Sequence, residues 1–206
     1  PGAHTVRFEL SDNNGLLVGR TLCFWLDDAA SQIVWKTQVS ANCQATPLYL
    51  QGKLYIGAND GGVYCFDTAT GEFKWRILTG GEVRGGPVAL PEADAMYVGS
   101  GNGIVRCLTL DGHERWQTNL GQPIYSPATV KGDLLYMTAT DGSIFALNWK
   151  TGAKIWQNDA PEYSIETACT VTDDTAFIGA WDRYVYAINS STGELRWRQP
   201  GKGSEG

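Results

Sequence analysis

Short apolar runs, each bounded by glycine, asparagine or aspartate, follow one another along the chain. In one representative stretch the runs lie at 47–50, 54–57, 63–67 and 73–77. The segment Asn59-Asp60-Gly61-Gly62 separates the second run from the third and predicts a hairpin turn, because Asn and Gly adopt positive φ readily. No stretch follows the period of a helix. Four short antiparallel strands in ~40 residues are typical of one propeller blade.

The same order of runs returns along the chain and is marked by tryptophan. Five tryptophans, Trp35, Trp75, Trp116, Trp156 and Trp197, are separated by 40, 41, 40 and 41 residues. A small residue precedes each of them by four positions: Ser31, Gly71, Gly112, Gly152 and Gly193. A four-stranded sheet cannot bury both of its faces alone, so each blade must pack on its neighbours. We therefore expect these tryptophans to be structural and to dock one blade on the next.

The repeat divides the chain into units at about 5–35, 40–75, 79–116, 120–156 and 160–197. The predicted fold is an all-β propeller of four-stranded blades over residues 5–199, with four complete units after a degraded first one. Residues 200–206 are rich in Gly and Ser and predict a linker. Three arrangements stay open: a five-bladed ring, part of a larger ring, or copies that associate through exposed blade edges.

The end of each unit carries a shared motif, Asp/Asn-x-x-Thr-Gly-x-x-x-Trp in its fullest form, as at residues 67–75 and 189–197. It resembles the PQQ-like, or quinoprotein-type, repeat over about residues 40–199. The family is similar to the propeller lipoprotein of outer-membrane barrel assembly and to accessory propeller modules of larger bacterial proteins. The resemblance implies a non-catalytic interaction scaffold, or an accessory or sensing module. Its partner would be another protein or a neighbouring domain of a parent chain.

Composition narrows the classes of protein further. The chain has 206 residues, a formal net charge of −6, 43% hydrophobic and 18% charged residues, which is typical of a globular protein. The apolar runs are far shorter than the ~20 residues that span a bilayer, so we expect no transmembrane segment. There is no excess of Lys and Arg to neutralise phosphates, so nucleic acid is not an expected partner.

Few residues of the sequence indicate a catalytic site. Quinoprotein dehydrogenases of this repeat family hold the quinone beside Ca²⁺ and a catalytic Asp, often with a disulfide between adjacent cysteines. None of the five cysteines here is adjacent to another, and the two histidines, His4 and His113, form no triad or metal motif. We therefore expect no catalytic residue, cofactor or metal, and a PQQ-dependent oxidoreductase fragment is the alternative. The compartment stays open, since the resemblance implies the cell envelope and an odd number of thiols favours a reducing one.

Acidic or amide side chains recur at one turn of each unit, at Asp60, Asn102, Asp141 and Asp182. Such residues are common in turns for conformational reasons. A cation held by converging carboxylates is the alternative interpretation.

The last unit departs from the repeat where a propeller exposes its loops. It carries Trp181, Asp182, Arg183 and Tyr184 in place of Asn59-Asp60-Gly61-Gly62. The nearby linkers add Glu82, Arg84, Tyr125, Glu162, Tyr163 and Glu166. Exposed aromatic residues beside arginine are typical of protein interfaces, so these residues are the predicted partner-binding site. Two alternatives stay open: Trp181 and Tyr184 fill a blade junction, or Trp181 and Trp149 bind carbohydrate.

Overall fold

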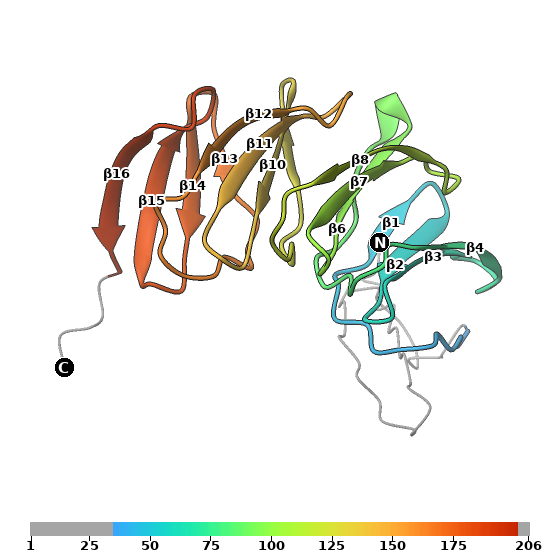
Figure 1. Ribbon diagram of the computed structural model, residues 1–206. Helices are drawn as coiled ribbons and strands as arrows, with labels where there is room; N and C mark the ends of the chain where they lie inside the picture. The colour runs from blue at the N-terminus through green and yellow to red at the C-terminus, as the bar shows by residue number, and fades with distance from the viewer. Residues whose placement is uncertain (1–34, 202–206) are drawn as a thin grey trace, which may run out of the picture.

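The computed structural model describes residues 35–201, which form four antiparallel sheets of four strands each (Figure 1). Blade 1 contains β1 (Leu48–Leu50), β2 (Lys53–Gly57), β3 (Gly62–Asp67) and β4 (Phe73–Leu78). Blade 2 contains β5 (Val88–Leu90), the 3-10 turn η1 (Pro91–Ala93), β6 (Ala95–Gly99), β7 (Ile104–Leu108) and β8 (Glu114–Asn119). Blade 3 contains β9 (Thr129–Lys131), β10 (Leu134–Thr138), β11 (Ile144–Asn148) and β12 (Lys154–Asn158). Blade 4 contains β13 (Thr170–Val171), β14 (Thr175–Gly179), β15 (Tyr184–Asn189) and β16 (Leu195–Pro200).

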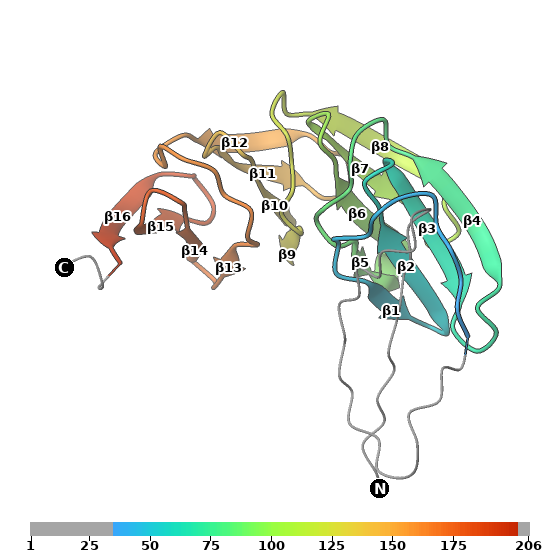
Figure 2. The same ribbon diagram turned by 90° about the horizontal axis from the view of Figure 1, so that it is seen from below.

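The blades stand side by side in an open arc (Figure 2). In each blade the first strand lies on the concave side of the arc and the fourth on the convex side. The predicted all-β propeller of four-stranded blades is confirmed. The degraded first unit and the end of the predicted linker lie outside the described residues, so the blade number of the ring stays a prediction. Within residues 35–201 the only helical segment is η1, and none is long and apolar enough to cross a membrane.

The hydrophobic core lies between the blades. Tyr97 and Cys107 of blade 2, for example, pack in one cluster with Leu135, Met137 and Phe145 of blade 3. Corresponding clusters join blade 1 to blade 2 and blade 3 to blade 4. Because strands alternate their side chains between two faces, every blade contributes one apolar set to each neighbour.

Each periodic tryptophan of blades 1 to 3 lies on the turn glycine of the following blade. Trp156 is 8% exposed, and its Nε1 donates a hydrogen bond to the carbonyl of Ser190 in blade 4 at 3.0 Å. A Cβ built on Gly193 would lie 2.6 Å from Cδ2 of the Trp156 ring. The other pairs are Trp75 on Gly112 and Trp116 on Gly152, and Trp35, which precedes blade 1, lies on Gly71 in the same way. This turn favours glycine for two reasons. The indole lies too close to leave room for a Cβ, and φ is positive, 77° at Gly193.

The linker before a blade is bonded to two blades at once. The carbonyl of Glu82 accepts a hydrogen bond from the amide of Gly101 in blade 2 at 2.8 Å. The amide of the next residue, Val83, donates to the carbonyl of Ala58 in blade 1 at 3.0 Å. Pro123-Ile124 and Ser164-Ile165 make the same pair of bonds at the next two junctions. Each linker therefore fixes the position of its own blade against the preceding one.

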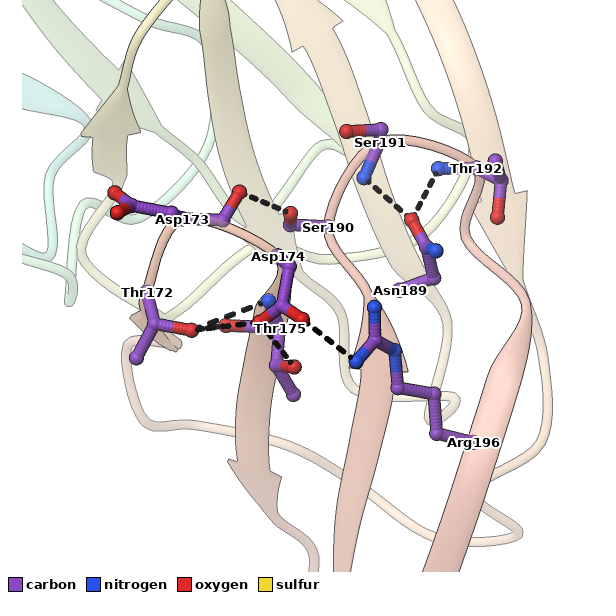
Figure 3. A network of polar contacts seen from close by, with 9 residues as sticks. All are labelled: Thr172, Asp173, Asp174, Thr175, Asn189, Ser190, Ser191, Thr192 and Arg196. Carbon is purple, nitrogen blue, oxygen red and sulfur yellow. Dashed lines mark hydrogen bonds and ion pairs between the residues drawn. The ribbon is translucent and has the colours of Figure 1, made fainter.

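The recurrent Asp/Asn-x-x-Thr-Gly motif forms a side-chain-capped turn. In blade 4, Oδ1 of Asn189 accepts hydrogen bonds from the amides of Ser191 and Thr192 at 2.9 and 3.0 Å (Figure 3). Asp67 and Asn148 make equivalent bonds in blades 1 and 3. The motif is thus explained by turn geometry.

The neighbouring β13–β14 turn is tied to the last strand of blade 4. Arg196 donates to Asp174 at 2.9 Å, and the hydroxyl of Thr175 donates to the same side chain at 2.9 Å (Figure 3). These two hydrogen bonds, that from Thr175 first, lower the pKa of the Asp174 carboxyl. Asp174 therefore links the β13–β14 turn to strand β16.

Four of the five cysteines, Cys43, Cys65, Cys107 and Cys169, are described, and all four are free and buried. Burial raises the pKa of Cys43 and Cys169 to about 12 and that of Cys107 to about 11. A thiol that stays protonated is a poor nucleophile, so these cysteines act as small apolar side chains.

We expect at most one thiol per chain, that of Cys23, to react with Ellman's reagent at pH 8 under native conditions. All five should react in guanidinium chloride. Because the folded chain keeps these thiols protonated, their contribution to stability is complete below their ordinary pKa of 9.0 and disappears as the pH rises toward 12. Denaturation midpoints measured from pH 8 upward should therefore fall. Rapid native labelling of two or more thiols would contradict this account.

Candidate functional site

One edge of the arc carries both the inter-blade linkers and the turns between the second and third strands of each blade. We name this edge the linker rim. Its turns span 58–61, 100–103, 139–142 and 180–183, each closed by a backbone hydrogen bond between its end residues. Backbone bonds from the linkers hold these turns in place, so side chains on the linker rim stand on a fixed framework.

Glu82, Arg84 and Tyr125 lie together on the linker rim above blade 2. Arg84 pairs with the carboxylate of Glu82 at 2.5 Å, and its guanidinium lies 4.6 Å from the centroid of the Tyr125 ring. An exposed ion pair of this kind contributes little to stability. The three side chains nevertheless restrict one another and present a guanidinium stacked on an aromatic ring.

Trp181 and Tyr163 form a second cluster where blades 3 and 4 meet. Trp181 is 71% exposed and Tyr163 is 61% exposed. The amide of Trp181 donates to the carbonyl of Ser164 at 3.1 Å, which fixes the backbones of the two aromatic residues beside each other. The amide of Glu162 adds a bond to Asp182 at 3.3 Å. Trp181 thus does not fill a blade junction.

Arg183 adopts a left-handed backbone conformation at the tip of the β14–β15 turn. Its φ is 72°, whereas glycine stands at this place in the other blades, at Gly61, Gly103 and Gly142. A residue with a Cβ is disfavoured there by about 1 kcal/mol or more. Backbone strain that the other three blades avoid at this turn, kept next to an exposed Trp, points to a role for Arg183 outside folding.

The side chains of Asp182 and Tyr184 make contacts within blade 4. Asp182 accepts hydrogen bonds from the amide of Tyr184 at 2.9 Å and from the hydroxyl of Tyr186 at 2.5 Å. Burial raises the pKa of Asp182, but these hydrogen bonds outweigh it, so the net pKa lies below the ordinary range. Arg198 lies 5.1 Å from the ring centroid of Tyr184. In the β14–β15 turn, Trp181 and Arg183 are therefore the exposed residues of the predicted site, whereas Asp182 and Tyr184 support the turn.

The recurrent turn side chains cap their own turns. Asp60, Asn102 and Asp141 accept hydrogen bonds from amides two residues later, at 2.8, 3.2 and 3.0 Å, as Asp182 does. Among residues 35–201 no group of three or more His, Cys, Asp or Glu side chains is arranged to hold a metal ion. The alternative of a cation at converging carboxylates gains no support in this part of the chain.

The remaining candidates lie apart from these clusters. Glu166 is exposed on the linker of blade 4, three residues after Tyr163. Trp149 lies at the opposite edge, half-buried, with its Nε1 bonded to the carbonyl of Gly132 at 3.1 Å. Trp149 is therefore a less accessible candidate than Trp181 for a carbohydrate ring.

The structure also shows a surface that sequence reasoning missed. Trp197 was expected to dock like the other periodic tryptophans, but no blade follows blade 4 within the described residues, and Trp197 is 43% exposed. Val185 on the same face is 41% exposed.

We expect Arg183→Gly to stabilise the chain by about 0.5–1 kcal/mol, because the relief of the positive φ outweighs the cost of the greater entropy that glycine has in the unfolded state. Urea denaturation measures this change. Gln51→Gly is a matched control, since Gln51 is an exposed residue with a φ of 50° away from the linker rim. A loss of stability in Arg183→Gly alone would assign the arginine a structural role instead.

These features define a class of protein: a β-propeller of PQQ-like repeats with exposed aromatic residues on its linker rim. The family model described as outer membrane protein assembly factor BamB matches residues 5–84 and 63–205. The chain belongs to this family.

Two curated relatives illustrate the extent of the match. The outer membrane protein assembly factor BamB of Nitrosomonas eutropha is 26% identical over 125 residues, which cover 60% of this chain and 30% of the relative. That of Shewanella oneidensis is 28% identical over 126 residues, which cover 55% and 32%. The chain spans about a third of the length of these relatives.

Solved structures show the same fold. BamB from Moraxella catarrhalis matches with a TM-score of 0.68 and 18% identity, over 82% of this chain and 56% of that one. The computationally designed Ika4 protein matches with a TM-score of 0.68 and 19% identity, over 78% and 99%. Quinohemoprotein alcohol dehydrogenase from Comamonas testosteroni matches with a TM-score of 0.65 and 17% identity, over 78% and 35%. At these identities the likeness shows the fold alone.

Proposed function

We propose that this chain is a non-catalytic propeller that binds a protein partner through Trp181, Arg183 and Tyr163 on the linker rim. The observation that carries the proposal is the left-handed Arg183 beside the 71% exposed Trp181, at a turn where the other blades have glycine. A rigid aromatic residue next to arginine is the usual composition of an interface hot spot. The partner is a separate protein or a neighbouring domain of a parent chain.

Family membership supports an interaction role, because the relatives are described as assembly factors for outer membrane proteins. Glu82, Arg84 and Tyr125 lie on the same rim and extend the proposed surface toward blade 2. A surface divided over two clusters suits a macromolecule better than a small ligand, which is enclosed by a single concave pocket.

Site-specific photocrosslinking in the host bacterium tests the proposal. A benzophenone amino acid is placed at position 181 and, as a matched control, at Ser191, which is exposed at the opposite edge. We expect a protein adduct from position 181 only, and its loss when Arg183 and Tyr163 are changed to alanine in the same chain. Equal adducts from both positions, or none from position 181, would count against the linker rim.

Two other functions are tested separately. Titration with pyrroloquinoline quinone and Ca²⁺ tests the oxidoreductase alternative, for which saturable binding with dye reduction is the required result. Tryptophan fluorescence on a glycan panel tests the carbohydrate-binding alternative, and Trp181→Ala should abolish any signal that arises at the linker rim. We expect neither titration to saturate.

A further inference from the structure

At one junction of the linker rim a cation lies on an aromatic ring, and the chain itself supplies both groups. The guanidinium of Arg84 pairs with the carboxylate of Glu82 at 2.5 Å and lies 4.6 Å from the centroid of the Tyr125 ring. A planar cation beside a carboxylate and over an aromatic face is favourable, because both neighbours attract it. This junction therefore shows a chemistry that the linkers of this chain can hold.

The linker of blade 4 carries the opposite charge at the equivalent position. Arg84, Tyr125 and Glu166 occupy this position in three successive linkers, each directly after the residue whose amide bonds to the preceding turn. Glu166 is exposed, and within residues 35–201 it forms no ion pair. Glu162 of the same linker is also exposed and forms no ion pair with the described residues. Two uncompensated carboxylates therefore lie on this linker.

Exposed aromatic rings lie next to these carboxylates. Tyr163 directly follows Glu162 in the chain, and Trp181 of the adjoining turn is 71% exposed. The amide of Glu162 donates to the Asp182 side chain at 3.3 Å. The amide of Trp181 donates to the carbonyl of Ser164 at 3.1 Å, so the linker and the turn are bonded on both sides of Tyr163. Rings and carboxylates are therefore held on one framework where blades 3 and 4 meet.

The chain supplies no cation to this second cluster. Arg183 is exposed, and in the part of the chain that the structure describes it forms no ion pair and stacks on no ring. Arg198 of β16 offsets the charge of Asp182 alone among the five carboxylates of this linker and its two turns. The other four are those of Asp141, Asp159, Glu162 and Glu166. Such an excess of negative charge attracts a basic partner and repels anionic lipid and nucleic acid.

We propose that the linker rim at blade 4 binds an arginine side chain of the protein partner, over the Trp181 ring and beside the carboxylates of Glu162 and Glu166. The partner thereby supplies the group that Arg84 supplies within the chain above blade 2. Arginine fits better than lysine, because its planar guanidinium both stacks on a ring and donates paired hydrogen bonds to a carboxylate. This inference rests on the proposed function, since it names the chemistry of the partner at the same surface.

A defined peptide tests the inference without knowledge of the partner. The peptide acetyl-Gly-Gly-Arg-Gly-Gly-amide is titrated into the full chain. The same peptide with citrulline in place of arginine is the matched control, because citrulline replaces the guanidinium by a neutral group of nearly the same shape. Fluorotryptophan incorporation and ¹⁹F NMR follow the tryptophans, and the resonance of Trp181 is assigned by Trp181→Phe.

We expect the arginine peptide to shift the Trp181 resonance and the citrulline peptide to bind at least about fivefold more weakly, because it lacks the charge that the ring and the carboxylates attract. Glu162→Gln together with Glu166→Gln should weaken the arginine peptide by about three- to tenfold at low ionic strength. Glu92→Gln together with Glu194→Gln is the matched control and should leave its affinity unchanged. Both of these carboxylates are exposed at the opposite edge and form no ion pair within residues 35–201.

Equal responses to the two peptides, or a Trp181 resonance that moves with neither, overturn the inference. A response that survives neutralisation of both Glu162 and Glu166 overturns it as well. Photocrosslinking from position 181 keeps the proposed function separate: an adduct without a peptide response overturns the arginine contact alone, whereas a peptide response without an adduct overturns the protein partner. Where an adduct forms, mass spectrometry should place it in a segment of the partner that contains arginine, and changing that arginine to glutamine should reduce its yield.

Discussion

We expect Trp156→Ala to lower the free energy of unfolding by about 3–5 kcal/mol, the range for removing a large buried aromatic side chain. The indole lies between the Tyr136 ring and Gly193, and its Nε1 bonds to Ser190. Its removal leaves a cavity between blades 3 and 4 that rigid sheets cannot close. The carbonyl of Ser190 keeps the hydroxyl of Tyr136 as a donor, at 3.1 Å, so most of the loss arises from packing.

Trp197→Ala is the matched control, because Trp197 occupies the same place in its blade but is 43% exposed. We expect it to change stability by less than about 1 kcal/mol, as is usual for surface substitutions. Urea denaturation followed by circular dichroism measures both variants. Equal losses in the two would show that inter-blade docking is not what the periodic tryptophans contribute.

Gly152→Ala should destabilise the chain by about 2–4 kcal/mol, through backbone strain and overpacking together. The φ of Gly152 is 73°, and a Cβ there would lie 2.5 Å from Cε3 of Trp116 and 2.6 Å from Oγ1 of Thr118. Both neighbours are held in place, since Trp116 bonds to the carbonyl of Trp149 and Thr118 to that of Gly152. The alanine therefore displaces the docked indole of blade 2.

Gly132→Ala separates the two causes. Gly132 has a φ of 58° with no atom within 4 Å of a built Cβ, so alanine there introduces backbone strain alone. We expect a loss of about 1 kcal/mol at Gly132. The excess at Gly152 in thermal or urea denaturation then measures the indole contact. No excess would mean that the turn, and not the docking of Trp116, demands the glycine.

Turn chemistry made the blades predictable. Strands were expected at 54–57 and 63–67 and lie at Lys53–Gly57 and Gly62–Asp67, because the intervening Asn-Asp-Gly-Gly segment has one favourable turn geometry. The periodic tryptophans placed the inter-blade contacts for a similar reason, since only a glycine turn admits an indole so closely. The size of the ring was not predictable, because it depends on small rotations between blades that no single residue records.

The candidate site was predictable only in part. Trp181 and Arg183 were singled out as departures from the repeat, and both project from a turn that the backbone places at the linker rim. Pattern alone did not separate them from Asp182 and Tyr184, which hydrogen bonds and a guanidinium hold against blade 4. The uncovered face escaped notice because its residues match the repeat and only their surroundings differ.

The linkers have a consequence for how such proteins change in evolution. Adjacent residues, such as Glu82 and Val83, are bonded to different blades, so one inserted residue would move one of the two bonds by ~3.3 Å. We therefore expect small insertions and deletions to be tolerated better at the tips of turns than in the linkers. By the same argument, we expect a change in the length of such a propeller to be accommodated most easily as a whole repeat of 40 or 41 residues.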